Sequence, residues 1–341
     1  MTIRFAAVGL DHRHVYGQVA CLIDAGAACV GYASGTSGGD PHVLEGFAER
    51  FPQVPAVDDA QRLLDDPSID LIVSAAIPDA RAPLGIAAMR RGKDFMSDKP
   101  GFASLDQLDA AEAAQRETGR IYSVCFSERF EVPAVARAQA LVADGAIGTV
   151  VQTVGLGPHR LNRHMRPDWF FDAARYGGIV NDIASHQIDQ FLVFTGATEV
   201  EIAASTVANF ATPDAPRFED FGEVLLRAPG ASGYIRVDWY TPDGLATWGD
   251  GRLTILGTEG FIELRKYVDI AGRPGTDHLF LVNGEETRHI DCADEPLSYG
   301  ARLIADVRDR TETAMSQAHC FRTSRLALEA QDRATRLGHP A

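Results

Sequence analysis

The sequence of 341 residues is long enough for about two domains of ordinary size. Hydrophobic residues make up 45% and charged residues 23%, which is typical of a globular protein and excludes a mainly disordered chain. The net charge of -15, without any basic run, argues against a nucleic-acid binder, and no apolar stretch reaches the roughly 18 residues that a membrane helix needs.

The first 125 residues alternate short apolar strands with amphipathic helices. The apolar run 3–8 ends at Gly9, as expected of a buried parallel strand, and the apolar residues of 15–23 then recur at helical spacing. Repeated units of this kind predict a doubly wound, Rossmann-like domain over residues 1–125. The predicted strands are 3–8, 28–33, 70–74, 94–96 and 121–126, and the predicted helices are 15–23, 61–64, 84–91 and 104–118.

The turn after the first predicted strand reads Gly9-Leu10-Asp11-His12-Arg13-His14. A full dinucleotide fingerprint has three glycines here, and only Gly9 is present. One glycine permits a sharp turn that points a helix N-terminus at a pyrophosphate, so the segment fits a pyrophosphate loop and a plain strand–helix turn about equally well. The carboxylate of Asp11 disfavours a phosphate unless it turns away or caps the helix, and Arg13 with the two histidines can offset its charge.

The end of the second predicted strand bears on the choice between NAD and NADP. An acidic residue there binds the ribose hydroxyls of NAD and repels the 2′-phosphate of NADP. The sequence has Ala33-Ser34-Gly35-Thr36-Ser37, with no acid to exclude NADP and no arginine or lysine to select it. Both cofactors stay open.

The pattern changes after residue 125 to longer strand-like segments separated by turn signals such as Pro229-Gly230 and Asp243-Gly244. Strands clustered without helices between them predict an α+β domain over residues 126–341, built on a mostly antiparallel open sheet. The predicted strands are 149–154, 200–207, 222–227, 233–239, 252–256 and 260–264, with a helix at 133–143 and one or two helices over 297–337.

Two segments carry candidate chemistry. Ser97-Asp98-Lys99-Pro100 follows the strand 94–96, so Lys99 is expected at the carboxyl edge of the sheet, unless it is an ordinary solvated lysine. After the glycine pair 177–178, Asp182, His186 and Asp189 fall on one helical stripe. The alternative interpretation is that these residues form only the solvent-exposed polar face of an amphipathic helix.

Together these motifs resemble the Gfo/Idh/MocA oxidoreductases, the family of glucose–fructose oxidoreductase and inositol dehydrogenase. The resemblance covers nearly the whole chain. Residues 97–100 look like the family's Glu-Lys-Pro motif with Asp for Glu, and 177–189 looks like its Gly-Gly…Asp-x-x-x-His-x-x-Asp segment. Ile77-Pro78-Asp79 stands at the family's Thr-Pro-Asn, Ser127-Glu128-Arg129-Phe130 at its Asn-x-Arg-Phe, and the turns 145–148 and 257–260 match two more.

The resemblance implies a dehydrogenase or reductase that uses NAD or NADP. A histidine suits transfer of the hydroxyl proton near neutral pH, so His186 is the candidate acid/base. Asp182, one turn earlier, is the candidate to orient the substrate or tune His186, and Lys99 is the candidate donor to the reacting oxygen. The candidate cofactor-binding residues are Gly9, Leu10, His12, Arg13, His14, Ser34, Ile77, Pro78, Asp98, Lys99, Pro100 and Ser127.

The segment 157–171 is rich in aromatic rings and hydrogen-bond donors, which suits a sugar, cyclitol or sugar acid. Arg129, Arg163 and Arg166 could also bind a carboxylate in bidentate fashion, although an ordinary loop with surface arginines fits the segment 157–171 as well. The histidines 159, 164 and 186 match no standard metal-site spacing, so no metal is expected. The candidate substrate-binding residues are Arg129, His159, Arg163, Arg166, Trp169, Asp182 and His186.

Two functions fit this sequence. The first is an NAD(P)-dependent oxidoreductase acting on a hydroxyl or keto group of a polyhydroxy small molecule, and the second is a non-catalytic sugar- or nucleotide-sensing protein that retains the fold.

An open antiparallel sheet face needs a cover, which predicts a homodimer or homotetramer. Five cysteines without metal or disulfide spacing, and an N-terminal segment unlike a signal peptide, predict a cytoplasmic protein with no membrane partner.

Overall fold

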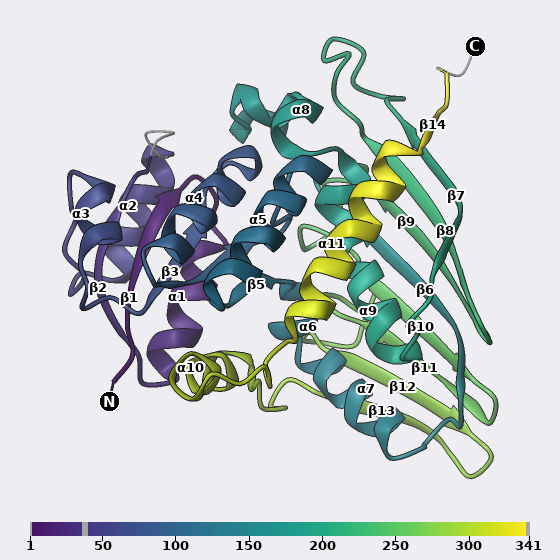
Figure 1. Ribbon diagram of the computed structural model, residues 1–341. Helices are drawn as coiled ribbons and strands as arrows, with labels where there is room; N and C mark the ends of the chain where they lie inside the picture. Colours follow the sequence, from purple (N-terminus) through teal and green to yellow (C-terminus); the bar gives the residue numbers. More distant parts are fainter. Residues whose placement is uncertain (1, 36–39, 339–341) are drawn as a thin grey trace. The chain divides into compact units, whose positions relative to one another are not determined.

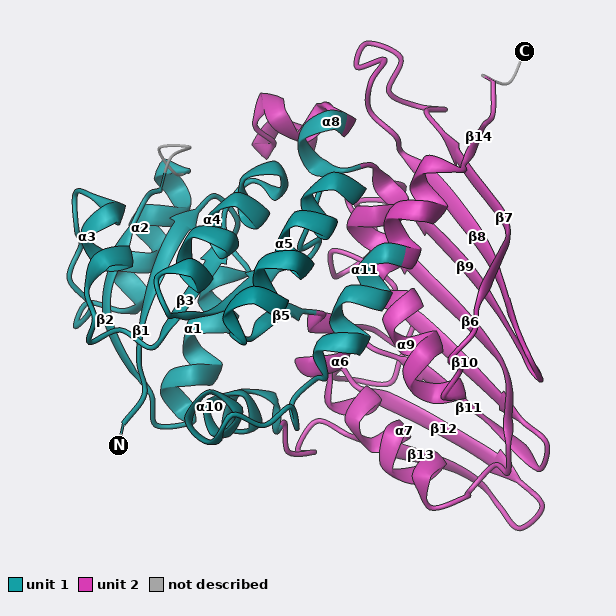
Figure 2. Cartoon of the chain, viewed as in Figure 1, with its two compact units in different colours: residues 1–125, 174–177, 298–325 teal, residues 126–173, 178–297, 326–341 magenta. Residues whose placement is uncertain are grey.

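The computed structural model describes residues 2–35 and 40–338, which form two compact units. The first unit comprises residues 1–125, 174–177 and 298–325, and the second comprises 126–173, 178–297 and 326–341 (Figure 2). Thr36 and Ser37, which the cofactor prediction used, lie outside the described residues.

The first unit is built on a parallel sheet, as predicted (Figure 1). Within the described residues its five strands lie in the order β2-β1-β3-β4-β5, so β1 is flanked by β2 and β3. Ligands of such sheets bind at the carboxyl ends of the strands, where the strand order reverses. The strands are β1 (Arg4–Leu10), β2 (Ala28–Ala33), β3 (Leu71–Ala75), β4 (Asp94–Asp98) and β5 (Tyr122–Cys125).

The helix after β3 begins earlier than predicted. The segment 84–91 carries the helical spacing, but the helix α4 extends over Pro78–Arg90 and contains Pro83. Pro83 has no N–H for the carbonyl of Asp79, four residues earlier. The Gln107 side-chain amide donates to that carbonyl at 2.8 Å, which compensates the missing hydrogen bond.

A helix that the sequence analysis did not predict covers Pro41–Arg50 (α2). Asp40 caps it by accepting hydrogen bonds from the amides of His42 and Val43, and Pro41 occupies its first turn. The remaining helices with residues in the first unit are α1 (Val15–Asp24), α3 (Ala60–Asp65), α5 (Leu105–Thr118), α8 (Ala173–Tyr176), α10 (Tyr299–Asp309) and α11 (Gln317–Asp332), of which α8 and α11 also contribute residues to the second unit.

The second unit is built on a larger sheet that is mostly antiparallel, as predicted. Among the described residues its strands follow the order β13-β12-β11-β10-β6-β9-β8-β7-β14, and the pairs β6–β9 and β7–β14 are parallel. The strands are β6 (Val150–Pro158), β7 (Glu201–Ala208), β8 (Phe221–Ala228), β9 (Ala231–Asp238), β10 (Arg252–Gly257), β11 (Gly260–Arg265), β12 (His278–Asn283), β13 (Thr287–Asp291) and β14 (Thr335–Arg336).

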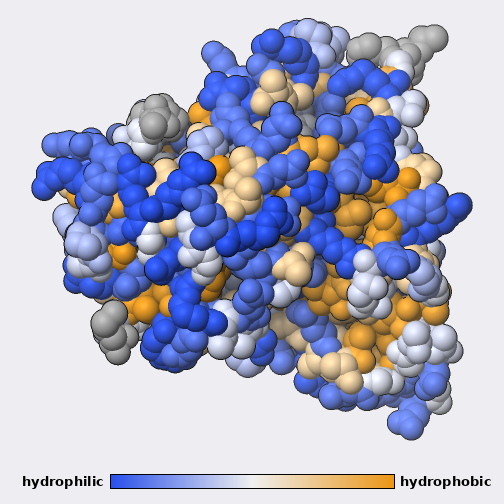
Figure 3. All heavy atoms as spheres, in the orientation of Figure 1, coloured by the Kyte–Doolittle hydropathy of each residue, from blue (hydrophilic) through white to orange (hydrophobic). Residues whose placement is uncertain are grey.

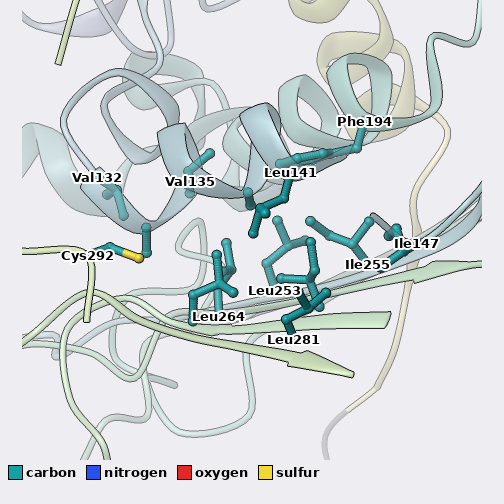
Figure 4. Close-up of a cluster of buried hydrophobic side chains, with 14 of the residues drawn as sticks. Val132, Val135, Leu141, Ile147, Phe194, Leu253, Ile255, Leu264, Leu281 and Cys292 are labelled. Carbon is teal, nitrogen blue, oxygen red and sulfur yellow. The ribbon is translucent and has the colours of Figure 1, made fainter. Parts of the chain in front are cut away.

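Helices cover one face of this sheet. Helix α7 (Pro133–Ala143) packs on β11 and β12, and α9 (Ser185–Thr195) packs on β6 and β9. Figure 4 shows the core beneath them, in which Val135 and Leu141 meet Leu253, Leu264 and Leu281. The helices therefore bury the apolar face of the sheet.

Glycines in the strands let α9 approach the sheet closely. A Cβ at Gly155 would lie 2.6 Å from the Gln187 side chain, and one at Gly233 would lie 2.8 Å from the Phe191 ring. Real Cβ atoms do not come so near, so any larger residue at either position would push the helix away from the sheet.

The hairpin of β12 and β13 was not predicted, although Asn283-Gly284 between the strands is a hairpin signal. Two helices, α10 and α11, occupy the C-terminal region, in agreement with the sequence.

Figure 3 shows a largely hydrophilic face on which hydrophobic residues gather over part of the second unit. All five cysteines have free thiols. None of the helices in the described part of the chain is long and apolar enough to cross a membrane.

Candidate functional site

The turn between β1 and α1 requires glycine at its start. Gly9 has φ +77°, and a Cβ there would lie 2.7 Å from the Cβ of Ala76. Asp11 is buried and turned away from the helix end, because its carboxylate accepts a hydrogen bond from the backbone amide of Ile77 at 3.2 Å. The acid that disfavours a phosphate at this turn is thus directed toward the neighbouring loop.

Two histidines of this turn meet the carboxylate at the end of β4. The Nδ1 of His14 lies 2.9 Å from Oδ1 of Asp98, and the Nδ1 of His12 lies 3.5 Å from Oδ2. The two imidazole rings contact each other edge to face, with 4.1 Å between centroids. Burial, followed by the neighbouring His14, lowers the pKa of His12 well below 6.5, so its ring is neutral at pH 7.

Arg81 holds Asp98 from the other side. Its guanidinium lies 3.1 Å from Oδ2 of Asp98 and also donates to the carbonyls of Ala76 and Pro100. Burial alone would raise the pKa of Asp98, but the attraction of His14 and Arg81 outweighs it and lowers that pKa. Asp98 is therefore a carboxylate at any physiological pH.

Lys99 follows directly and is buried, with 7% of its surface exposed. The interpretation of Lys99 as a solvated surface lysine is therefore wrong. Its amide donates to Oδ1 of Asp98 at 2.8 Å, and its peptide bond to Pro100 is cis. Of the remaining cofactor candidates in this unit, Ile77 and Pro78 begin α4, Leu10 ends β1, Arg13 is exposed in the turn, and Ser34 follows β2 half-buried.

In the second unit, the segment after the double glycine is a π-helical turn, η3 (Val180–Ala184), that continues into α9. Both glycines have positive φ. A Cβ at Gly178 would lie 2.1 Å from Cδ of Gln331, whose side-chain oxygen accepts from the amide of Val180 at 2.9 Å. The close approach that this glycine permits is thus made by a glutamine of α11.

The polar residues of α9 do not form an outer face. His186 and Asp189 are buried at 2% and 0% exposure, so the interpretation of this stripe as a solvated polar face is wrong. The His186 ring meets the Phe126 ring edge to face at 6.5 Å. Asp182 lies in η3, half-buried.

A buried carboxylate, Glu128 of the short helix α6 (Ser127–Phe130), organises the surroundings of His186. Its Oε2 accepts from Nζ of Lys266 at 2.5 Å and from the side-chain amide of Gln187 at 3.0 Å. Burial alone would raise the pKa of Glu128, but attraction to Lys266 and then to His186 lowers it to about 2. Glu128 is therefore an anion in the electrostatic range of His186.

Arg129, from the same short helix, binds Asp189. Its Nε and Nη2 lie 2.6 and 2.9 Å from the two carboxylate oxygens, a bidentate buried pair. The arginine that the sequence offered for a substrate carboxylate thus holds a carboxylate of the protein. Ser127, the cofactor candidate of this unit, begins α6.

The predicted substrate segment contributes an aromatic row. The centroid of the His159 ring lies 5.2 Å from that of Trp239 and 4.6 Å from that of Trp248. Trp248 in turn packs against Tyr267, with tilted rings whose centroids are 4.5 Å apart. The charge of Glu128 also interacts with His159, so His159 and His186 share one electrostatic environment.

The other candidates of this segment lie around Phe170 and Phe171. Arg166 covers the Phe170 ring at 4.4 Å, and Arg163 covers Phe171 and pairs with Asp214. Trp169 is half-buried and contacts Phe170.

Sequence reasoning missed three residues of these clusters, namely Arg81, Glu128 and Lys266. Lys266 carried a signal, since it is one of only three lysines in the chain. Arg81 carried none, because nothing local distinguishes it from a surface arginine of a helix.

The parallel sheet with its β1–α1 turn defines a dinucleotide-binding fold joined to an α+β unit. Residues 33–126 match the family model "Oxidoreductase family, NAD-binding Rossmann fold", and residues 135–263 match the GFO/IDH/MocA C-terminal domain. The chain belongs to the GFO/IDH/MocA family of NAD(P)-dependent oxidoreductases, which confirms the predicted class and the NAD or NADP cofactor.

Three similar proteins illustrate the relationship. A crystal structure from Erwinia carotovora atroseptica SCRI1043, of a protein assigned as an oxidoreductase, is 46% identical with a TM-score of 0.94 and covers 99% of this chain and 100% of its own. The scyllo-inositol 2-dehydrogenase (NAD(+)) of Bacillus subtilis (strain 168) is 28% identical over 76% of this chain and 73% of its own. Levoglucosan dehydrogenase in complex with NADH and levoglucosan shares the fold, with 19% identity and a TM-score of 0.79 over 97% of this chain and 96% of its own.

The chain spans 37% to 57% of the length of other curated relatives that it matches, a group that includes an inositol 2-dehydrogenase of Rhodococcus jostii (strain RHA1).

Proposed function

We propose that this protein is a dehydrogenase or reductase that transfers hydride between NAD or NADP and a hydroxyl or keto group of a sugar, cyclitol or sugar acid. Family membership supports the reaction class. The inositol and levoglucosan dehydrogenases among its relatives support the substrate class, since both of their named substrates are polyhydroxy rings.

The observation that carries the proposal is the burial of Lys99 at the carboxyl end of β4. Lysines are rarely buried unless the ammonium forms an ion pair or takes part in binding or catalysis. Lys99 stands in the Lys-Pro motif whose lysine, in this family, assists the reacting oxygen. Its ammonium would donate to that oxygen and favour the alkoxide form.

The first unit fits a dinucleotide. Gly9 makes the sharp turn, Asp11 is turned aside, and α1 begins at Val15 with its positive helix end beside Arg13. A helix end of this kind attracts a pyrophosphate. When bound, the nicotinamide would supply the hydride acceptor or donor, and the protein supplies orientation and proton transfer.

In the second unit, His186 would take the hydroxyl proton during oxidation and return it during reduction. The nearby anion Glu128 stabilises the protonated imidazole, and Asp182 one turn earlier would orient the substrate hydroxyl. The aromatic row around His159 would contact the apolar faces of a sugar ring.

The test is binding and turnover with both cofactors. Enhanced nicotinamide fluorescence on mixing with NADH or NADPH measures binding, and a panel of polyols, aldoses and sugar acids measures turnover. With an active substrate, Lys99→Met is expected to lower kcat about 10²- to 10³-fold. His186→Asn is expected to lower it about 10²-fold or more and to flatten its pH profile.

His42→Ala, at an exposed histidine of α2, serves as the control and should leave kcat unchanged. Lys99→Arg keeps a cation and tests whether charge alone is sufficient. Cofactor binding without turnover across the panel would contradict the proposal and favour the sensing alternative.

We also propose that the chain works as a homodimer or homotetramer in the cytoplasm. The free thiols of all five cysteines are consistent with a reducing compartment. The mass in solution at micromolar concentration tests the oligomer, and a monomer would contradict it.

A further inference from the structure

We propose that His12, His14 and Asp98 form a binding site for a divalent transition-metal ion of the Zn²⁺ or Co²⁺ type. One ligand atom from each of the three side chains lies within 4.8 Å of the other two. The two histidines come from the turn after β1 and the carboxylate from the end of β4, so strands that are not neighbours in the sheet supply the ligands.

The spacing of the donor atoms suits a small ion. Zn²⁺ binds imidazole nitrogen and carboxylate oxygen at about 2.0–2.1 Å, which places neighbouring ligand atoms of a tetrahedron about 3.3 Å apart. The Nδ1 of His14 lies 2.9 Å from Oδ1 of Asp98, and the Nδ1 of His12 lies 3.5 Å from Oδ2, so the two imidazoles face different oxygens of one carboxylate at distances on either side of this value. The three ligand atoms lie within 4.8 Å of one another, so the side chains would have to draw closer around a bound ion.

The type of donors selects the class of metal. Two imidazoles with one carboxylate suit Zn²⁺, Co²⁺, Ni²⁺ or Fe²⁺, whereas Mg²⁺ and Ca²⁺ prefer oxygen ligands alone. Three protein ligands leave at least one coordination position for water or another oxygen ligand, as in catalytic metal sites.

Arg81 supplies the outer support that such sites need. It bonds Oδ2 of Asp98 and two backbone carbonyls, while the Lys99 amide bonds Oδ1. A carboxylate oxygen accepts at two lone-pair positions, so these donors fix the carboxylate and still leave lone pairs directed toward the histidines.

The positive charge of Arg81 opposes a dication, but the two histidines are partly exposed to solvent. The side chains of His12 and His14 are 29% and 35% exposed, so water and counter-ions screen the repulsion. The same exposure gives an ion a path to the ligands.

This inference goes beyond the proposed function, because metal uptake is measured on the protein without cofactor or substrate. A native protein that binds the metal but turns over no substrate contradicts only the oxidoreductase proposal. Turnover without metal binding contradicts only the metal site.

The experiment measures Co²⁺ and Zn²⁺ binding to the full chain after treatment with a chelator. Titration calorimetry and elemental analysis give affinity and stoichiometry, and the visible spectrum of bound Co²⁺ reports its coordination geometry. We expect one ion per chain in the native protein and in His42→Ala, whose exposed imidazole lies on α2. His12→Ala and His14→Ala should each weaken binding at least about tenfold, since loss of a mere outer-shell partner costs 10- to 100-fold.

His12→Gln and His14→Gln keep side-chain bulk and guard against a loss caused by misfolding, which near-ultraviolet circular dichroism checks. Absence of stoichiometric uptake by the native protein would overturn the proposal. Unchanged affinity in folded variants at either histidine would overturn it as well.

Discussion

The Lys266 ammonium and the Glu128 carboxylate form a buried ion pair, with 2.5 Å between Nζ and Oε2. The two side chains are 0% and 3% exposed, and Gln190 offers its side-chain oxygen to the same ammonium at 3.2 Å. The pair joins α6 to the residue directly after β11, and the charge of Glu128 interacts with His186.

Lys266→Met is expected to lower the free energy of unfolding by about 3–5 kcal/mol, because it leaves the Glu128 charge buried without its partner. Urea unfolding followed by fluorescence measures this loss. The double variant Lys266→Met/Glu128→Gln removes both charges and should recover part of the stability. A single variant within about 1 kcal/mol of the native protein would show that the pair is not electrostatically important.

The low pKa of Glu128 makes stability depend on pH in acid. Since this pKa is about 2 in the folded chain and near 4.5 when exposed, the unfolded chain takes up the proton first as pH falls. The stabilisation by Glu128, a few kcal/mol, is complete above about pH 4.5 and is lost between there and pH 2. Glu128→Gln should therefore show a smaller fall in unfolding free energy over this interval, and equal slopes in the two proteins would contradict the assignment.

Gly178→Ala tests the packing before α9. The substitution meets both an unfavourable φ of +82° and the Gln331 side chain, which a Cβ would approach to 2.1 Å. Gly145→Ala is a matched control, since it has φ +80° and nothing within 4 Å of the added Cβ. We expect about 1 kcal/mol of destabilisation at Gly145 and clearly more at Gly178, by thermal or urea unfolding. Equal losses of stability in the two variants would show that the Gln331 side chain moves aside at no energetic cost.

Gln107→Ala tests the compensation of Pro83. The side chain donates to the Asp79 carbonyl and accepts from the Ala103 amide, so its loss leaves two half-buried backbone groups without these bonds. We expect destabilisation by about 1–3 kcal/mol in urea unfolding. Gln61→Ala, at an exposed glutamine of α3, should change stability by less than about 0.5 kcal/mol.

Local patterns predicted most elements because their signals are short-range. The apolar run 3–8 and the strand-like segments after residue 148 correspond to β1 and to β6–β11, within a few residues at the ends. The start of α4 was placed too late because Pro83 looks like a helix breaker. The compensating Gln107 lies 24 residues away, so no local window contains both.

The candidate site was predictable in part, because its motifs lie beside strand ends. Asp98 is the last residue of β4 and Lys99 follows it, and the sequence placed Lys99 at the sheet edge. The partners of these residues could not be inferred, since Arg81 reaches Asp98 across 17 residues and Lys266 reaches Glu128 across 138.

The amino-acid sequence by itself determined the two fold classes and the family, because hydrophobic periodicity and short motifs depend only on neighbouring residues. Only the tertiary structure decided that His12 and His14 meet Asp98, that Arg129 is held by Asp189, and that the polar side of α9 is buried. Such pairings depend on how strands and helices distant along the chain pack together. A charge becomes costly to leave without a partner only when that packing buries it.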